Sequence, residues 1–173
     1  MRYEELTIEG RNAVMEAFRA GKTIDKLFVL DGCQDGPVRS IVREAKKRDT
    51  IIQFVAKERL DQMSETGKHQ GVIAYAAAYH YAQVEEMLQA AEEEGVAPFL
   101  ILLDGIEDPH NLGAIIRTAN LSGAHGVIIP KHRAAGLTAT VAKTSAGALN
   151  YTPVAKVTNL GKTMEELKEK GMW

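Results

Sequence analysis

Over the first 80 residues, short apolar runs alternate with segments in which apolar side chains recur every three or four positions. Short apolar runs bounded by turn residues predict strands, and the three-to-four spacing predicts helices. We therefore expect helices at residues 10–19, 37–48 and 57–63, and strands at residues 26–30, 51–55 and 71–79. Together these elements predict one small α/β unit, residues 1–80.

The next stretch, residues 81–96, is acidic and carries apolar residues at helical spacing. Val84, Met87, Leu88 and Ala91 would share one helical face, and Gly95 is suited to end the helix. The pattern leaves two alternatives open: the helix packs on a neighbouring element, or it acts as a linker between two units.

Residues 97–173 alternate more strictly between apolar runs and helical spacing. We expect strands at residues 99–103, 126–130 and 151–157, and helices at residues 112–122, 138–149 (with a break at Gly147 near its end) and 163–170. Strands separated by helices predict parallel pairing through right-handed crossovers. Because the chain stops at Trp173, where a next strand would begin, we expect this unit to be the first part of a larger parallel sheet.

The formal net charge of −2 by itself argues against a nucleic-acid partner, but the distribution of charge changes that picture. Residues 1–80 carry a net charge of +1, residues 81–95 carry −5 and residues 96–173 carry +2. A local basic surface is therefore compatible with the acidic total. Its candidates are Arg39, Arg43, Lys46 and Lys47 on helix 37–48, although a solvated helix face is the commoner explanation of such a stripe.

Residue content argues against several classes of protein. The single cysteine, Cys33, forms no intrachain disulfide, and His110, His125 and His132 lack the spacing of metal ligands, so we expect no metal. No apolar run is long enough to span a bilayer and the N-terminus is acidic, so we expect no membrane contact and a cytoplasmic location. Neither G-x-G-x-x-G nor a Walker lysine motif occurs, which argues against nicotinamide dehydrogenases, ordinary Rossmann methyltransferases and P-loop enzymes.

The segment with the clearest chemical potential is DGIEDPHNLGAIIRTAN, residues 104–120, which follows a predicted buried strand and opens a helix. Ligand sites of open α/β sheets lie beyond the carboxyl ends of the strands. Asn111 is suited to cap the helix, while Gly113 and Arg117 would share a face where a substrate could approach a permanent cation. The alternative is that Asn111 is only a cap and Arg117 only a surface charge.

Two other short segments are candidates for binding. His69 and Gln70 precede a predicted strand and could clamp RNA, although a polar loop with a turn glycine explains them as well. The small residues of segment 144–148 would let a ligand or another backbone come close, and tight helix packing explains them equally well.

The motifs together resemble the SpoU (TrmH-like) family of RNA 2′-O-ribose methyltransferases, within the SPOUT superfamily. DPHNLGAIIRTAN is similar to the first signature of that family, and KTSAGAL followed by YTPV is similar to a later segment. GRNAVMEAF and HQGVIA resemble the N-terminal RNA-binding domain of the same family. The resemblance covers essentially the whole chain.

The resemblance implies an N-terminal RNA-binding domain (residues 1–80), an acidic linker or helix (81–96) and the first part of a parallel-sheet SPOUT methyltransferase domain (97–173). It implies methyl transfer from S-adenosylmethionine to a ribose 2′-hydroxyl, with a guanosine of 23S rRNA as the expected target. Arg117 and Asn111 would be catalytic, and Ser145 and Gly147 would lie near the cofactor. Residues Arg11, Asn12, His69 and Gln70, with Arg39 and Arg43, would bind RNA.

The sequence departs from the family pattern in one respect. Two further family signatures, which form the trefoil knot, the main cofactor loops and much of the dimer interface, do not occur by Trp173. We therefore expect a homodimer only for a longer chain, and neither normal cofactor binding nor catalysis from these residues alone. The alternatives are a tRNA ribose methyltransferase, a non-catalytic RNA-binding protein and a protein-interaction domain without an RNA partner.

Overall fold

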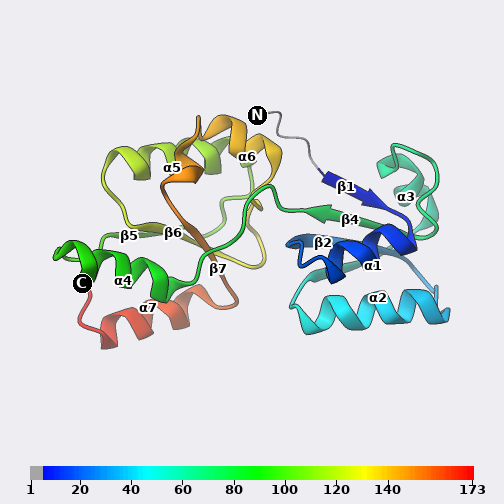
Figure 1. Cartoon of the computed structure of the whole chain (residues 1–173), viewed down its shortest axis with the longest axis horizontal. Helices are drawn as coiled ribbons and strands as arrows, with labels where there is room; N and C mark the ends of the chain where they lie inside the picture. Colours follow the sequence, from blue (N-terminus) through cyan, green and yellow to red (C-terminus); the bar gives the residue numbers. More distant parts are fainter. Residues whose placement is uncertain (1–5) are drawn as a thin grey trace. The chain divides into compact units, whose positions relative to one another are not determined.

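The computed structural model describes residues 6–173, in which strands and helices alternate along most of the chain (Figure 1). These residues divide into two units, the first ending at Ala78 and the second beginning at Tyr79. The first unit contains a four-stranded sheet and the second a three-stranded sheet. Each sheet is covered by helices on both faces, so each unit has its own apolar core.

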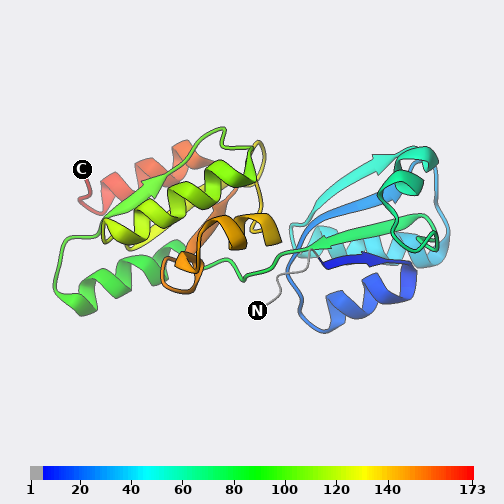
Figure 2. The same cartoon turned by 90° about the horizontal axis from the view of Figure 1, so that it is seen from above.

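The first unit is built on a mixed sheet. Its elements are β1 (Leu6–Glu9), α1 (Arg11–Arg19), β2 (Ile24–Leu30), α2 (Gly36–Lys47), β3 (Ile51–Val55), α3 (Lys57–Met63) and β4 (Val72–Ala76). The strand order is β1-β4-β2-β3, which Figure 2 shows from above. β2 and β3 are parallel, whereas β4 is antiparallel to both of its neighbours, β1 and β2.

The alternation of side chains along β2 divides this core in two. Leu27 and Val29 face α1 and α2, where they pack in one cluster with Phe18 and Ile41. Phe28 faces the other way, in a cluster with Leu60 of α3 and Ile73 of β4. The helical spacing predicts one apolar face of α2 made of Val38, Ile41, Val42 and Ala45; Val38, Ile41 and Ala45 are buried, and Val42 is partly buried against the same cluster.

The second unit is built on a parallel sheet. Its elements are α4 (Val84–Glu94), β5 (Leu100–Leu102), α5 (Pro109–Leu121), β6 (Gly126–Pro130), α6 (Ala139–Thr144), the 3-10 turn η1 (Ala148–Asn150), β7 (Val154–Val157) and α7 (Leu160–Glu169). The strand order is β5-β6-β7, and both pairs are parallel, as the alternation of strands and helices predicted. Figure 1 shows α5 and α6 on one face of this sheet and α4 and α7 on the other.

The acidic segment forms α4, whose apolar face is packed rather than left exposed. Met87 and Ala91 are fully buried, and Met87 shares a cluster with Ile128 of β6 and Leu167 of α7. Its glutamates project into solvent, which explains why one short segment carries so much of the negative charge. Of the two alternatives left open for residues 81–96, packing on a neighbouring element is the observed one.

The predicted fold class, a small α/β domain followed by a parallel-sheet domain, is confirmed, but the predicted elements need corrections of detail. Predicted strand 71–79 ends at Ala76, and predicted strand 151–157 begins at Val154. The strand β1 lay outside the predicted elements. The predicted helix 138–149 stops at Thr144, because Ala146 and Gly147 both adopt positive φ angles, 50° and 88°, and only a 3-10 turn follows.

Candidate functional site

Helix α5 begins beyond the carboxyl end of β5, at the edge of the sheet where α/β proteins bind ligands. Its N-cap is Asp108, whose carboxylate accepts a hydrogen bond from the His110 backbone N–H at 2.8 Å. The prediction that Asn111 caps this helix is therefore wrong. Pro109 fixes the first helical position, so the residue before it takes the capping role and Asn111 lies inside the first turn.

Asn111 and Arg117 are both exposed on α5. Within residues 6–173 the structure shows no ion pair to the Arg117 guanidinium, so its charge faces solvent. On the packed side of the same helix, Leu112 and Ile116 are fully buried in the core. The burial of that side fixes the helix and leaves the cation of Arg117 presented outward.

Gly113 serves packing between helices and not the approach of a substrate, which corrects that expectation. A Cβ atom at this position would lie 1.9 Å from Thr144 Oγ1 and 3.0 Å from the Ser145 backbone nitrogen. The absence of a side chain therefore lets α6 come close to α5. This contact joins the predicted catalytic helix directly to the segment predicted to lie near the cofactor.

The Ser145–Gly147 turn is held by its own hydrogen bonds. The Ser145 side chain is fully buried, and its hydroxyl donates to the Ala142 carbonyl at 2.9 Å. A ligand at this turn would therefore meet its backbone rather than the Ser145 hydroxyl. Gly147 has little around it, since a Cβ added there would meet only Asn150 Nδ2, at 3.9 Å.

In the first unit, the structure brings together two of the predicted RNA-binding segments. The Arg11 backbone N–H donates to Gln70 Oε1 at 3.1 Å, and Arg11 Nε donates to the Gln70 carbonyl at 3.0 Å. The Arg11 guanidinium also forms an ion pair of 2.6 Å with Asp35, the N-cap of α2. Arg11 thus fixes the starts of α1 and α2 against the loop before β4, and its charge is partly neutralised.

Asp35 is suited to that role because it is held as a carboxylate. The hydrogen bond from the Val38 backbone N–H lowers the pKa of Asp35 below its ordinary value; partial desolvation opposes this and the Arg11 charge adds to it. Asp35 was not among the predicted site residues. Its position before Gly36 and Pro37, at the start of a predicted helix, is the signal that could have identified it.

His69 is buried, with only 7% of its surface exposed. Its Nδ1 accepts a hydrogen bond from the Gly71 backbone N–H at 2.9 Å, so in the neutral ring Nε2 carries the proton and donates to Asp61 Oδ1, also at 2.9 Å. The ring therefore shapes the loop, while Gln70, at a φ of 52°, is the exposed member of the pair.

The remaining predicted RNA-binding residues are all exposed. Asn12 lies in the first turn of α1, and Arg39 and Arg43 lie one turn apart on α2. The structure shows no ion pair to Arg39 or Arg43 within the part of the chain that it describes. The two arginines are therefore available to a polyanion in this unit.

Glu9, at the end of β1, anchors the loop that leads to His69. Its carboxylate accepts hydrogen bonds from the Ser64 hydroxyl at 2.5 Å, the Glu65 backbone N–H at 2.6 Å and the Thr66 hydroxyl at 2.7 Å. Desolvation acts to raise the pKa of Glu9, but these hydrogen bonds outweigh it, so the pKa lies below the ordinary value of 4.5. No local pattern in the sequence indicated this long-range contact.

We expect Glu9→Gln to destabilise the chain at neutral pH, because an amide cannot accept all of these hydrogen bonds. The folded-state pKa of Glu9 is lowered, so the stabilisation is present above the unfolded-state value and is lost as the pH falls through the folded-state value. The difference in free energy of unfolding between the wild type and Glu9→Gln should therefore shrink below about pH 4.5. Urea denaturation from about pH 7 to about pH 3 measures it.

Glu65→Gln is the matched control, since Glu65 is exposed in the same loop and contributes its backbone rather than its carboxylate. The difference in free energy of unfolding between Glu65→Gln and the wild type should stay near zero over the whole pH range. A constant difference for Glu9→Gln across the range would contradict the role given to the carboxylate.

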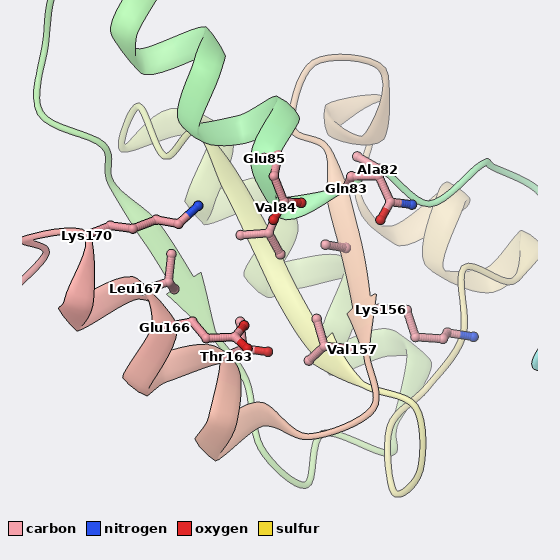
Figure 3. Close-up of a pocket in the computed structure, with 11 residues that line it drawn as sticks. Ala82, Gln83, Val84, Glu85, Lys156, Val157, Thr163, Glu166, Leu167 and Lys170 are labelled. Atoms are coloured by element: carbon pink, nitrogen blue, oxygen red, sulfur yellow. The ribbon is translucent and has the colours of Figure 1, made fainter.

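A pocket of about 170 Å³ lies on the other face of the second sheet, between the start of α4, β7 and α7 (Figure 3). Val84, Val157 and Leu167 line it together with the charged residues Glu166 and Lys170. None of the predicted site residues lines it. The pocket is therefore separate from the candidate site on α5.

Two further properties of the described residues bear on function. Within residues 6–173, no group of three or more His, Cys, Asp or Glu side chains is placed to hold a metal ion. In the same part of the chain, no helix is both long enough and apolar enough to cross a bilayer.

Two family models match the chain, one for each unit. Residues 7–82 match a domain described as RNA 2′-O ribose methyltransferase substrate binding. Residues 98–173 match the SpoU rRNA methylase family. The first match ends before α4 and the second begins after it, so neither includes this helix.

The chain is also similar to curated proteins. It is 50% identical over 164 residues to a protein of Bacillus subtilis named as a TrmH-family tRNA/rRNA methyltransferase, covering 95% of this chain and 66% of that protein. A protein of the same description from Staphylococcus aureus is 47% identical over 171 residues, covering 98% of this chain and 68% of that protein. The chain thus spans about two thirds of the length of these relatives.

Among solved structures, the SpoU methyltransferase AviRb from Streptomyces viridochromogenes, in complex with AdoMet, is 22% identical with a TM-score of 0.45, over 96% of this chain and 60% of that chain. An AdoMet-bound rRNA methyltransferase from Sinorhizobium meliloti is 20% identical with a TM-score of 0.42, over 94% of this chain and 57% of that chain.

Proposed function

This chain belongs to the TrmH (SpoU) family of tRNA and rRNA methyltransferases, and we propose that the protein transfers a methyl group to a ribose 2′-hydroxyl of RNA. The observation that carries the proposal is the geometry of α5. The helix starts beyond the carboxyl end of β5, and its Arg117 presents an outward cation without an ion pair in the described part of the chain. A 2′-hydroxyl that attacks a methyl group loses its proton and develops negative charge on oxygen.

Arg117 supplies the positive charge for that oxygen. Arginine remains protonated at neutral pH and presents several N–H donors in one plane, so it acts as a fixed cation and not as a base. Donors aimed at a developing oxyanion lower the barrier because they interact more strongly with the transition state than with the neutral hydroxyl. The hydroxyl proton then passes to solvent or to another group.

Asn111 is proposed to orient the ribose. It lies in the first turn of α5, where its amide is exposed and can both donate and accept hydrogen bonds. A neutral amide at this position adds direction to the binding of a sugar hydroxyl without competing with the charge of Arg117.

The methyl donor in this proposal is S-adenosylmethionine, which supplies an activated methyl group. The Ser145–Gly147 turn fits one wall of a site for it: Gly147 leaves space beside the backbone, and the Gly113 contact holds the turn next to α5. Ser145 does not fit a direct contact through its hydroxyl, which is buried and engaged with Ala142. Gly147 would thus border the cofactor and Ser145 would support the turn from beneath.

For the substrate, we propose a guanosine of 23S rRNA, with a tRNA ribose as the alternative. The first unit would hold the RNA through Asn12, Gln70, Arg39 and Arg43, which are exposed, while Arg11 and His69 keep the loops in place. The relatives are named for both tRNA and rRNA, so the choice between them belongs to experiment. We also propose that the complete protein works as a homodimer in the cytoplasm.

Methyl transfer to defined RNAs tests the function. The complete protein, with S-adenosylmethionine labelled in the methyl group, is incubated with protein-free 23S rRNA fragments or with tRNA, and digestion locates the label. We expect label on one ribose of the rRNA, and none when that nucleotide is replaced by its 2′-deoxy form. Label on tRNA alone would support the alternative substrate, and RNA binding without transfer to either RNA would overturn the enzymatic proposal.

A further inference from the structure

The loop between β6 and α6 carries a cationic sequence that takes no part in the proposed site. Residues 131–136 read KHRAAG and follow Pro130 directly, at the same edge of the sheet as the start of α5. His132 and Arg133 are exposed, whereas Ala135 is buried in the core of the unit. We call residues 131–136 the KHR loop.

The backbone of the KHR loop and of the residue that follows it is hydrogen-bonded to three different neighbours. The Lys131 N–H donates to the Val157 carbonyl at the end of β7, at 2.7 Å, and the Ala135 N–H donates to the Ile106 carbonyl at 2.8 Å. Just after the loop, the Leu137 N–H donates to the Tyr81 hydroxyl at 2.9 Å. A loop held at both ends presents its exposed side chains at a low entropic cost of binding.

Arg133 itself is held in an unusual backbone conformation. Its φ of 56° lies in the left-handed region, which is unfavourable for a residue with a side chain. Within residues 6–173 the structure shows no ion pair to its guanidinium. The anchored backbone thus maintains an exposed arginine in a conformation that local preference does not favour, as is common at ligand-binding positions.

We propose that the KHR loop is a phosphate-binding element of the second unit, in which Arg133, with His132 beside it, contacts the backbone of the RNA. The bond between Ala135 and Ile106 places this loop against the β5–α5 loop that leads into α5. A planar guanidinium binds phosphate oxygens in pairs, which suits a contact that positions a strand without reading its sequence. The inference rests on the proposed function, since it names a contact to the same RNA.

A pair of matched substitutions tests the loop. Arg133→Gln removes the cation but keeps a long polar side chain. Lys170→Gln makes the matching change at the residue that follows α7, a helix that runs back from the carboxyl end of β7 toward the opposite edge of the sheet. In filter binding of the complete protein to RNA, Arg133→Gln should weaken affinity about tenfold. It should also reduce the slope of log affinity against log salt by about 1. Lys170→Gln should match the wild type in both.

Tyr81→Phe separates the position of the loop from its charge. The variant removes the hydroxyl that holds the Leu137 N–H but no cation, so RNA affinity should fall about two- to threefold with the salt slope unchanged. Hydrogen exchange of residues 131–138 should become faster. The control is Tyr79→Phe, which removes a hydroxyl bonded to Asn150 outside this loop. It should change neither the RNA affinity nor the hydrogen exchange of residues 131–138.

Equal affinities and slopes for Arg133→Gln and Lys170→Gln would overturn the inference, as would a protein that does not bind RNA at all. Methyl transfer is measured on the same preparations. RNA binding that depends on Arg133 in a protein without transfer would support the loop and overturn the proposed function. Methyl transfer by a protein whose RNA affinity does not depend on Arg133 would support the proposed function and overturn the inference about the loop.

Discussion

Arg117→Ala should lower the rate of methyl transfer about 100- to 1000-fold, the loss typical of removing one donor to a developing oxyanion. Arg117 is exposed and no ion pair in the described residues depends on it, so the free energy of unfolding should change by less than about 0.5 kcal/mol. Single-turnover assays with saturating RNA measure the chemical step, and urea denaturation measures stability.

Arg117→Lys separates the need for a positive charge from the need for the planar guanidinium. The lysine variant should retain about a tenth of the wild-type rate, because the positive charge remains but one point charge replaces a planar fork of donors. Arg59→Ala, which removes an exposed arginine of α3 with no assigned role, is the control and should keep the wild-type rate. An Arg117→Ala enzyme as fast as the Arg59→Ala control would exclude the proposed role of Arg117.

Gly113→Ala should destabilise the second unit by about 1–3 kcal/mol, although alanine is the better helix former. The added Cβ would lie 1.9 Å from Thr144 Oγ1 and 2.8 Å from Thr144 Cβ, so α5 and α6 must move apart. That movement would carry the Ser145–Gly147 turn away from α5, and methyl transfer should fall with stability. Thermal and urea unfolding measure the first effect, and the labelled-methyl assay measures the second.

Two variants check that this effect comes from the contact. Gly161→Ala makes the same chemical change in the first turn of α7, where an added Cβ meets only Asn159 Oδ1, at 3.4 Å, and it should be neutral or slightly stabilising. Adding Thr144→Ala to Gly113→Ala removes the nearest atom and should recover part of the loss. If Gly113→Ala proved as stable as Gly161→Ala, the close packing of α5 on α6 would not be needed for stability.

Most of the fold could be predicted because the local spacing of apolar residues indicates most of the helices and strands. The spacing of Val38, Ile41, Val42 and Ala45 predicts the apolar face of α2 from the sequence, and all but the partly buried Val42 are buried in the structure. The strand β1 was missed because it is only four residues long, LTIE, and its place depends on pairing with β4, more than 60 residues later. Such a strand forms because a partner edge exists, and single-sequence patterns do not report that edge.

The candidate site, too, could be predicted where its signal is local and not where it depends on contacts with distant parts of the sequence. Its location on α5 followed from a strand that leads into a helix, and this is a local signal. Arg11 forms an ion pair with Asp35, and His69 forms a hydrogen bond with Asp61. Gly113 packs against Thr144, and the local sequence patterns predict none of these three contacts. Even the choice between Asp108 and Asn111 as helix cap needed the structure, although Pro109 was a usable signal.

The pairing of β1 with β4 has a consequence for how the first unit can be handled as a module. Leu6 lies opposite Ala76 in an antiparallel pair, so the unit begins and ends on neighbouring strands, about 5 Å apart. A domain whose two ends meet in this way can be inserted into a loop of another protein without straining either host or guest. The same closure allows a circular permutant, with the old ends joined by a short linker and new ends opened at the Asp31–Gly32 turn after β2.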